Sequence, residues 1–145
     1  MRLSIAIRLT SLRRNLVSCC TPHLQARGVT PGLLYCVLYV GRHPGCTAGE
    51  VARFLQADPG QTTRAMGKLA GEGFVTRETD PKDHRVTRLA LTGKGEALFA
   101  DSRAMLEAWG SEAMAALTEE EVEQLWALLS KMSPIAELDF PPPEN

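Results

Sequence analysis

Two helix-start signals follow one another near the middle of the chain and strongly constrain its fold. Thr47-Ala48-Gly49-Glu50 is a capping box, in which Thr and Glu three residues apart satisfy each other's backbone N–H groups. Asp58-Pro59-Gly60-Gln61 has an Asp cap, proline at the first helical position and Gln at the third. We therefore predict two short helices, the second ending near Ala70, joined by few residues. Such a pair is a candidate helix-turn-helix.

The hydrophobic pattern changes its period after Gly73. Residues 74–79 and 85–91 are rich in β-branched side chains and partly alternate between apolar and polar. Asp80-Pro81-Lys82-Asp83-His84, between them, is a polar turn. We predict a β-hairpin with a charged tip.

Helices are predicted on both sides of this unit. A first helix covers residues 3–25, with Pro22 expected to kink or end it locally and Gly28 to cap it. A second runs from the Thr30 cap to the stop at 43–45. After the hairpin, one helix spans about 93–117 behind Thr92, another begins with a capping box at Thr118, and residues 141–143 form an extended tail. The first helix has an apolar stripe of Ile5, Leu9, Leu12 and Leu16.

Composition fits one globular domain. The chain has 145 residues, of which 44% are hydrophobic and 23% charged. Its longest apolar run, residues 33–40, is shorter than the roughly 18 residues of a membrane span, and arginines interrupt the N-terminal apolar stretch. We expect a soluble cytoplasmic protein without a membrane partner.

Charge is distributed unevenly although the net charge is only −1. Residues 1–46 carry +6, residues 47–92 carry +1 and residues 93–145 carry −8. Opposite charges suggest that the two ends lie against each other, within one chain or across a dimer. Two solvated faces are the alternative.

A helix-turn-helix followed at once by a hairpin is a winged helix, whose second helix fits the major groove of duplex DNA. Helical spacing assigns Thr62, Met66 and Leu69 to the core and places Gln61, Arg64, Ala65 and Lys68 on the other face. Gln61 and Arg64 can reach base edges, and Thr63 lies near the helix start, where phosphates bind. Taken alone, this face could also be an ordinary solvated surface.

The hairpin adds basic side chains. Asp83 precedes Arg85 by two residues, so its carboxylate is expected to brace the guanidinium before DNA arrives. The alternative is an exposed salt bridge worth about 0–1 kcal/mol. The predicted DNA-contacting residues are Thr47, Gln61, Thr62, Thr63, Arg64, Lys68, Arg77, Lys82, Asp83, His84, Arg85 and Arg88.

The chain from Thr30 to Met132 resembles the MarR family of winged helix-turn-helix transcriptional regulators. Leu34, Thr62 and Gly67 depart from residues frequent in that family. The matching motifs are Thr47-x-x-Glu50-Val51-Ala52, Thr63-Arg64 with Leu69-x-x-x-Gly73, Asp80-Pro81-x-Asp83-x-Arg85, and Leu91-Thr92-x-x-Gly95.

The resemblance implies a mainly α (α+β) fold, with a winged helix over 30–95, dimerisation helices over 1–28 and 96–140, and a tail over 141–145. It also implies a homodimer on a pseudo-palindromic site in double-stranded DNA. We expect a repressor relieved by a small aromatic or phenolic ligand, bound between the dimer helices and the winged helix. Arg13, His23 and Tyr35 are candidate lining residues, although Arg13 could instead meet the acidic last helix of a partner.

Parts of the sequence also fit other classes of function. Some relatives sense oxidants through a cysteine in the first helix, so a redox regulator using Cys19 and Cys20 is one alternative. Cys20-x-x-His23 and His43-x-x-Cys46 suggest zinc, but the helix between them separates the pairs by about 18 Å, and no metal or other cofactor is expected. Hydrolase and phosphate-loop motifs are missing from the sequence, so we expect no enzyme. A helical adaptor without DNA binding is the remaining alternative, and the salt dependence of DNA affinity distinguishes it from a DNA-binding protein.

Overall fold

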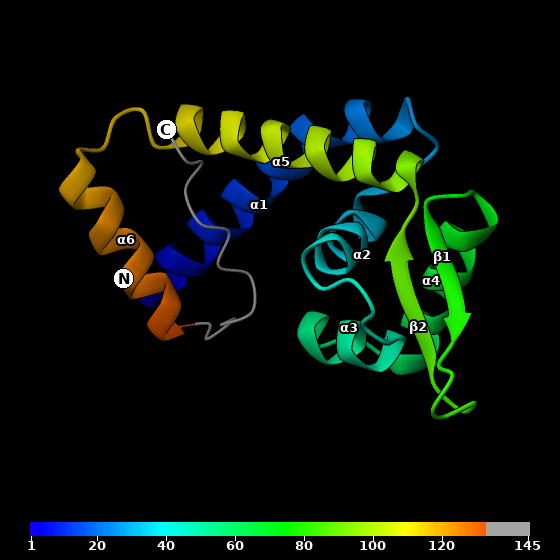
Figure 1. Cartoon of the computed structure of the whole chain (residues 1–145). Coiled ribbons are helices and arrows are strands. Elements are labelled where there is room, and N and C mark those ends of the chain that lie inside the picture. The colour runs from blue at the N-terminus through cyan, green and yellow to red at the C-terminus, as the bar shows by residue number, and fades with distance from the viewer. Residues whose placement is uncertain (133–145) are drawn as a thin grey trace.

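Six helices and one antiparallel hairpin make up the part of the chain that the structure describes. It is a computed structural model covering residues 1–132, so the predicted tail over 141–143 lies outside the described residues. Figure 1 shows α5 running along one side, with the hairpin and α2–α4 at one end and α6 at the other. The elements are α1 (Arg2–Gln25), α2 (Pro31–Arg42), α3 (Ala48–Leu55), α4 (Pro59–Gly71), β1 (Val75–Thr79), β2 (Thr87–Leu91), α5 (Gly93–Ala113) and α6 (Glu119–Met132).

Local capping fixes the helix starts at the centre of the chain. The Thr47 hydroxyl accepts a hydrogen bond from the Glu50 N–H, and the Glu50 carboxylate accepts one from the Thr47 N–H at 2.7 Å. Asp58 Oδ1 accepts from the Gln61 N–H at 2.8 Å, and the Thr92 hydroxyl accepts from Gly95 at 3.1 Å. The predicted starts of α3, α4 and α5 are therefore confirmed.

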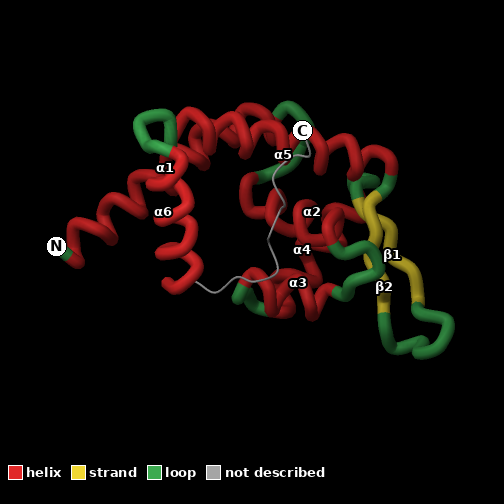
Figure 2. The backbone as a smooth tube through the Cα atoms, turned by 60° about the vertical axis from the view of Figure 1, so that its left-hand side comes forward, coloured by secondary structure: helices red, strands yellow, loops and turns green. Residues whose placement is uncertain are grey.

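The hairpin pairs Val75 with Leu91 and Thr79 with Thr87, and its tip projects beyond α3 and α4 (Figure 2). Leu89 forms an additional bridge to Cys46, which joins β2 to the loop between α2 and α3. A Cβ at Gly95 would collide with the carbonyl oxygen of Phe74, so glycine is required where α5 leaves the hairpin. The main core lies among α2, α4, the hairpin and α5.

One predicted helix end is confirmed and another differs. α1 ends at Gln25, as predicted, and Pro22 lies inside its last turn, where Cys20 and Leu24 are buried against the core. The helix after the hairpin ends at Ala113 rather than near residue 117. Gly28 takes a φ of +72° in the turn after α1, as its predicted capping role requires.

The N-terminal half of α1 and all of α6 project away from the winged helix (Figures 1 and 2). Ile5, Leu9 and Leu12 of the predicted stripe are 40–49% exposed, whereas Leu16 packs against the core. No described side chain of α6 is buried. None of the helices within residues 1–132 has the length and apolar character that crossing a membrane requires.

Candidate DNA-binding surface

The second helix of the motif, α4, has a core face and a solvent face. Met66 and Leu69 are buried, as the helical spacing predicts. Thr62 is 3% exposed, and its hydroxyl donates to the Asp58 carbonyl at 3.1 Å. Its predicted role as a DNA contact is therefore wrong, and Thr62 belongs to the core alone. The predicted contacts left exposed on α4 are Gln61, Thr63, Arg64 and Lys68.

Two guanidinium groups lie beside glycines of α4. A Cβ at Gly60 would be 3.9 Å from Nη1 of Arg64, and a Cβ at Gly67 would be 4.0 Å from Nη1 of Arg77. Arg77 comes from β1 and thus reaches α4 from the hairpin. The candidate DNA-binding surface is therefore built from both α4 and β1.

A hollow of about 380 Å³ lies between the start of α3, the exposed face of α4 and the hairpin. Thr47, Thr63, Arg77 and Arg85 line it, so the fold gathers four predicted contacts from distant parts of the chain. Guanidinium groups without a carboxylate partner are suited to binding phosphate. Within residues 1–132, no acid forms an ion pair with Arg64, Arg77, Lys82 or Arg85.

The two threonines of this hollow already make hydrogen bonds within the protein. The Thr47 hydroxyl donates to Glu50 at 2.8 Å, and these bonds hold the pKa of Glu50 below its usual range. The Thr63 hydroxyl donates to the Pro59 carbonyl at 2.9 Å. Thr47 therefore has a capping role in this structure, and the Thr63 hydroxyl would have to rotate to donate to a phosphate.

The predicted brace at the wing tip is wrong. Asp83 Oδ1 accepts from the backbone N–H of Arg85 at 3.0 Å and does not hold its guanidinium. The braced guanidinium is that of Arg88, whose Nε donates to Asp80 Oδ2 at 2.8 Å and whose Nη1 donates to the Gly45 carbonyl at 3.2 Å. These bonds use two of the five N–H donors of Arg88, whose side chain is 46% exposed, so its predicted DNA contact stays a prediction. Sequence reasoning missed Asp80 because strand register and the tip turn set its partner.

Comparisons with known proteins agree with this geometry. A family model described as MarR family matches residues 27–86. HTH-type transcriptional regulator BilQ of Clostridium symbiosum (strain WAL-14163) is 37% identical over 132 residues, which cover 91% of this chain and 92% of that protein. The chain belongs to the MarR family. It is a transcriptional regulator with a DNA-binding winged helix.

Two further comparisons extend the likeness of this MarR-family regulator. HTH-type transcriptional repressor MdtR of Bacillus subtilis (strain 168) is 28% identical, over 80% of this chain and 75% of that protein. The crystal structure of Streptococcus pneumoniae FabT in complex with DNA superposes with a TM-score of 0.82 at 21% identity, covering 94% of this chain and 98% of that one. The FabT likeness shows that the fold is shared.

Within the described residues, two apolar hollows away from the hairpin are lined in part by α2. One of about 260 Å³, between α1 and the start of α2, is lined by Arg13, Cys20 and Tyr35 among others, and His23 is not one of its lining residues. Partial burial raises the pKa of Tyr35, and nearby Arg13 opposes this rise. The other, of about 500 Å³ beneath α5, was not predicted, and its lining includes Leu38, Leu106 and Met114.

The cysteines lie in different environments. Cys19 is exposed, whereas Cys20 is buried and its pKa is raised, which disfavours a reactive thiolate. Burial raises the pKa values of Cys36 and Cys46 to about 11. Within the described chain, His, Cys, Asp and Glu side chains form no group of three that could hold a metal ion.

Proposed function

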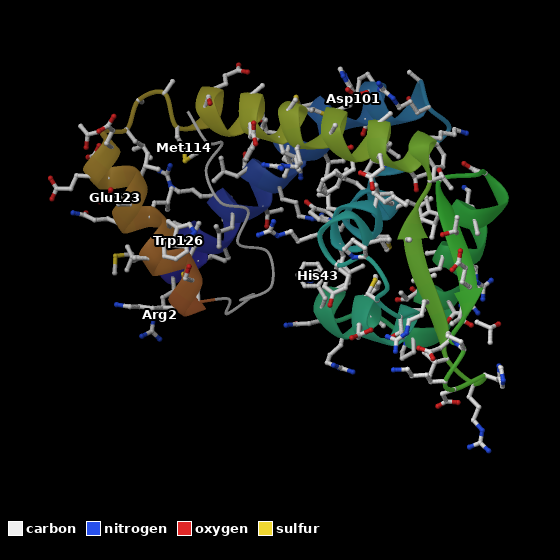
Figure 3. All side chains as sticks on the ribbon, in the orientation of Figure 1. Arg2, His43, Asp101, Met114, Glu123 and Trp126 are labelled. Carbon is white, nitrogen blue, oxygen red and sulfur yellow. The ribbon has the colours of Figure 1, made fainter. Side chains whose placement is uncertain are left out.

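We propose that this MarR-family regulator is a cytoplasmic homodimer that represses transcription by occupying a pseudo-palindromic duplex. α6 carries this proposal, because it exposes an apolar surface that the described chain does not cover. Trp126 is 62% exposed, Leu128 58% and Leu129 42%, and Figure 3 shows Trp126 far from the winged helix. Apolar patches of this kind mark sites of protein association. A second copy of the chain would bury them.

Charge supports the same pairing. The N-terminal part of α1 is basic and the first turns of α6 are acidic, so the helices of two copies would attract each other. The bases are Arg2, Arg8, Arg13 and Arg14, and the acids are Glu119, Glu120, Glu121 and Glu123.

In this dimer each α4 would enter a major groove, with the two helices one DNA turn, about 34 Å, apart. Gln61 and Arg64 would meet base edges, whereas Lys68 and Arg77 would meet phosphates. Arg85 would reach the adjacent minor groove from the projecting wing tip, with Lys82 and His84 near the backbone. The lack of acid partners for these arginines among the described residues supports this assignment.

Repression and its relief are further parts of the proposal. MdtR is named a repressor, and a regulator that covers its site excludes other proteins from it. The hollow between α1 and α2 would hold a single-ring anion, with Arg13 facing its acidic group and the Tyr35 hydroxyl nearby. α1 is one of the proposed dimerisation helices and α2 is part of the winged helix. A ligand between them would therefore favour one spacing of the two α4 helices in the dimer.

Selection of duplexes from a random library with the purified protein tests this function. We expect a pseudo-palindrome to be enriched, and 4-hydroxybenzoate to weaken its binding by the wild type but not by Arg13→Ala. A Tyr35→Phe variant keeps the ring and tests the hydroxyl alone. Enrichment of no sequence would contradict DNA recognition by this surface. An unchanged ligand response together with unchanged dimerisation in Arg13→Ala would remove Arg13 from both of its roles.

A further inference from the structure

We propose that Arg88 is a positioning residue, which holds the wing tip on the corner between α2 and α3 so that Arg85 is presented at a fixed place. This inference rests on the proposed role of Arg85 at the minor groove. It assigns Arg88 an effect on DNA recognition that does not require contact with DNA.

The guanidinium of Arg88 joins two backbone segments. Its Nε donates to Asp80 Oδ2 at 2.8 Å, and its Nη1 donates to the Gly45 carbonyl at 3.2 Å. The other oxygen of Asp80 accepts from the backbone N–H groups of Lys82 at 2.8 Å and Asp83 at 3.2 Å. The Asp80 carboxylate thus links Arg88 to the turn at the wing tip, and the Asp80 side chain is 15% exposed.

The corner at Gly45 is itself fixed to β2. The Gly45 N–H donates to the Leu89 carbonyl at 2.7 Å, and the Leu89 N–H donates to the Cys46 carbonyl at 2.8 Å. At the other end of the connection, the Asp83 carboxylate accepts from the Arg85 N–H at 3.0 Å. A connected set of hydrogen bonds therefore runs from Gly45, in the loop between α2 and α3, through Arg88 and Asp80 to the backbone of Arg85.

Strand register makes this arrangement specific. Glu78 is paired directly with Arg88 across the hairpin, where a cross-strand ion pair would ordinarily form. Arg88 instead bonds Asp80, and within residues 1–132 Glu78 makes no ion pair. Glu78 is therefore a matched control, because it is an acid on the same hairpin that lies outside the network.

DNA affinity gives the first test, because the proposal predicts that removing the Asp80 carboxylate weakens binding. Removing an acid beside DNA ordinarily strengthens binding, since phosphates repel carboxylates. We expect Asp80→Asn and Arg88→Gln to weaken binding to the duplex selected by the wild type by about fivefold. Glu78→Gln should leave it unchanged or stronger. Tighter binding by Asp80→Asn would overturn the proposal.

A double variant separates positioning from contact. If Arg88 acts through Arg85, Arg88→Gln should cost nothing further in an Arg85→Ala background, whereas independent phosphate contacts would give additive losses. Arg88→Gln should also abolish any preference for A·T over G·C pairs at the flanks of the duplex, as we expect of Arg85→Ala. Additive losses with an intact flank preference would overturn the proposal.

Amide hydrogen exchange needs no DNA, so its result is independent of the proposed function. Amide hydrogen exchange of the full-length free protein should show faster exchange at Lys82, Asp83 and Arg85 in Arg88→Gln than in the wild type. Glu78→Gln should exchange as the wild type does. The exchange rates of Arg88→Lys should lie between those of the wild type and Arg88→Gln. Unchanged protection of these amides in a folded Arg88→Gln protein would overturn the positioning role, whatever the DNA results are.

Discussion

At Arg85 the guanidinium meets no acid in the described part of the chain, whereas three residues later Arg88 bonds Asp80 and the Gly45 carbonyl. An unpaired guanidinium can approach phosphate or enter a narrow groove without first breaking a bond. The sequence shows both arginines but not this difference, because the partner of Arg88 depends on how the tip turns back. Spacing along the chain favoured Asp83, whose carboxylate in fact bonds the backbone.

Replacing Arg85 with Ala should weaken binding to the selected duplex at least tenfold, or about 1.4 kcal/mol. In a gel-shift titration at several salt concentrations, the salt slope should change little if Arg85 reads the groove and fall by about 0.9 if it neutralises a phosphate. Arg85→Lys keeps the charge but loses the planar fork, so an intermediate loss is expected. An unchanged midpoint for Arg85→Ala would remove the wing from the interface.

At the scale of the element, helix starts were predictable and some helix ends were not. The Thr47 and Asp58 caps bond residues three positions away, so the sequence contains the whole interaction. The end of α5 at Ala113 was missed because Ala115 and Ala116 favour helix, so propensity does not mark the stop. The continuation of α1 through Pro22 depends on burial of Leu24, which only the tertiary structure shows.

Two helical glycines should respond in opposite ways to alanine. At Gly67 the added Cβ would be 4.0 Å from Arg77, an ordinary contact, so Gly67→Ala should stabilise α4 by about 0.5–1 kcal/mol. At Gly41 it would lie 2.5 Å from the Phe99 ring, so Gly41→Ala should destabilise the packing of α2 on α5 by about 1–3 kcal/mol. Urea unfolding of the two variants and the wild type measures both effects. Equal effects at the two positions would contradict the close approach at Gly41.

The capping box of α3 should make stability depend on pH. Folding lowers the pKa of Glu50 from 4.5, mainly through its hydrogen bonds with Thr47. Its ionised form therefore stabilises the fold above pH 4.5, and this contribution is lost as the pH falls through the lower pKa of the folded state. Glu50→Gln should be less stable than the wild type by about 1 kcal/mol at pH 7.

The measurement for Glu50 is a series of urea unfolding curves from neutral to acidic pH. Other acids titrate in both proteins, so the difference between wild type and Glu50→Gln isolates this group. The difference should be constant at neutral pH and shrink below pH 4.5. A difference that stays constant throughout would contradict the role of the ionised carboxylate.

At the scale of the whole molecule, the buried core belongs to the winged helix and its junction with α1 and α5. The N-terminal half of α1 and the whole of α6 contribute no buried side chain to it. α1 exposes apolar side chains on two opposite faces, with Leu3 75% and Ile7 60% exposed on the face opposite the Ile5 stripe. Figure 3 places Arg2 of α1 and Glu123 of α6 at the same end of the molecule, opposite the hairpin. The division of charge along the sequence predicted that the two ends lie against each other. It did not predict that the apolar side chains of each end stay exposed within residues 1–132.

Charges placed on the exposed face of α6 should separate the two subunits of the proposed dimer. The double variant Trp126→Glu and Leu129→Glu would bring acids into a surface that a partner must bury, and unpaired buried charges are costly. Sedimentation velocity at micromolar concentration should show a dimer for the wild type and a single chain for the double variant. Lys131→Glu is the control, since it lowers the net charge by 2, as the double variant does, on the same helix at a position that is already charged. A double variant with the mass of the wild type would contradict an interface at α6.

The number of chains on one duplex tests the central claim most directly. Native mass spectrometry of the full-length protein with the selected pseudo-palindromic duplex should show two chains of 15.8 kDa per duplex. The same count should persist across protein concentrations, because the proposed dimer would form before it binds DNA. A complex with one chain per duplex, or a free protein that is a single chain and binds no duplex, would contradict the account.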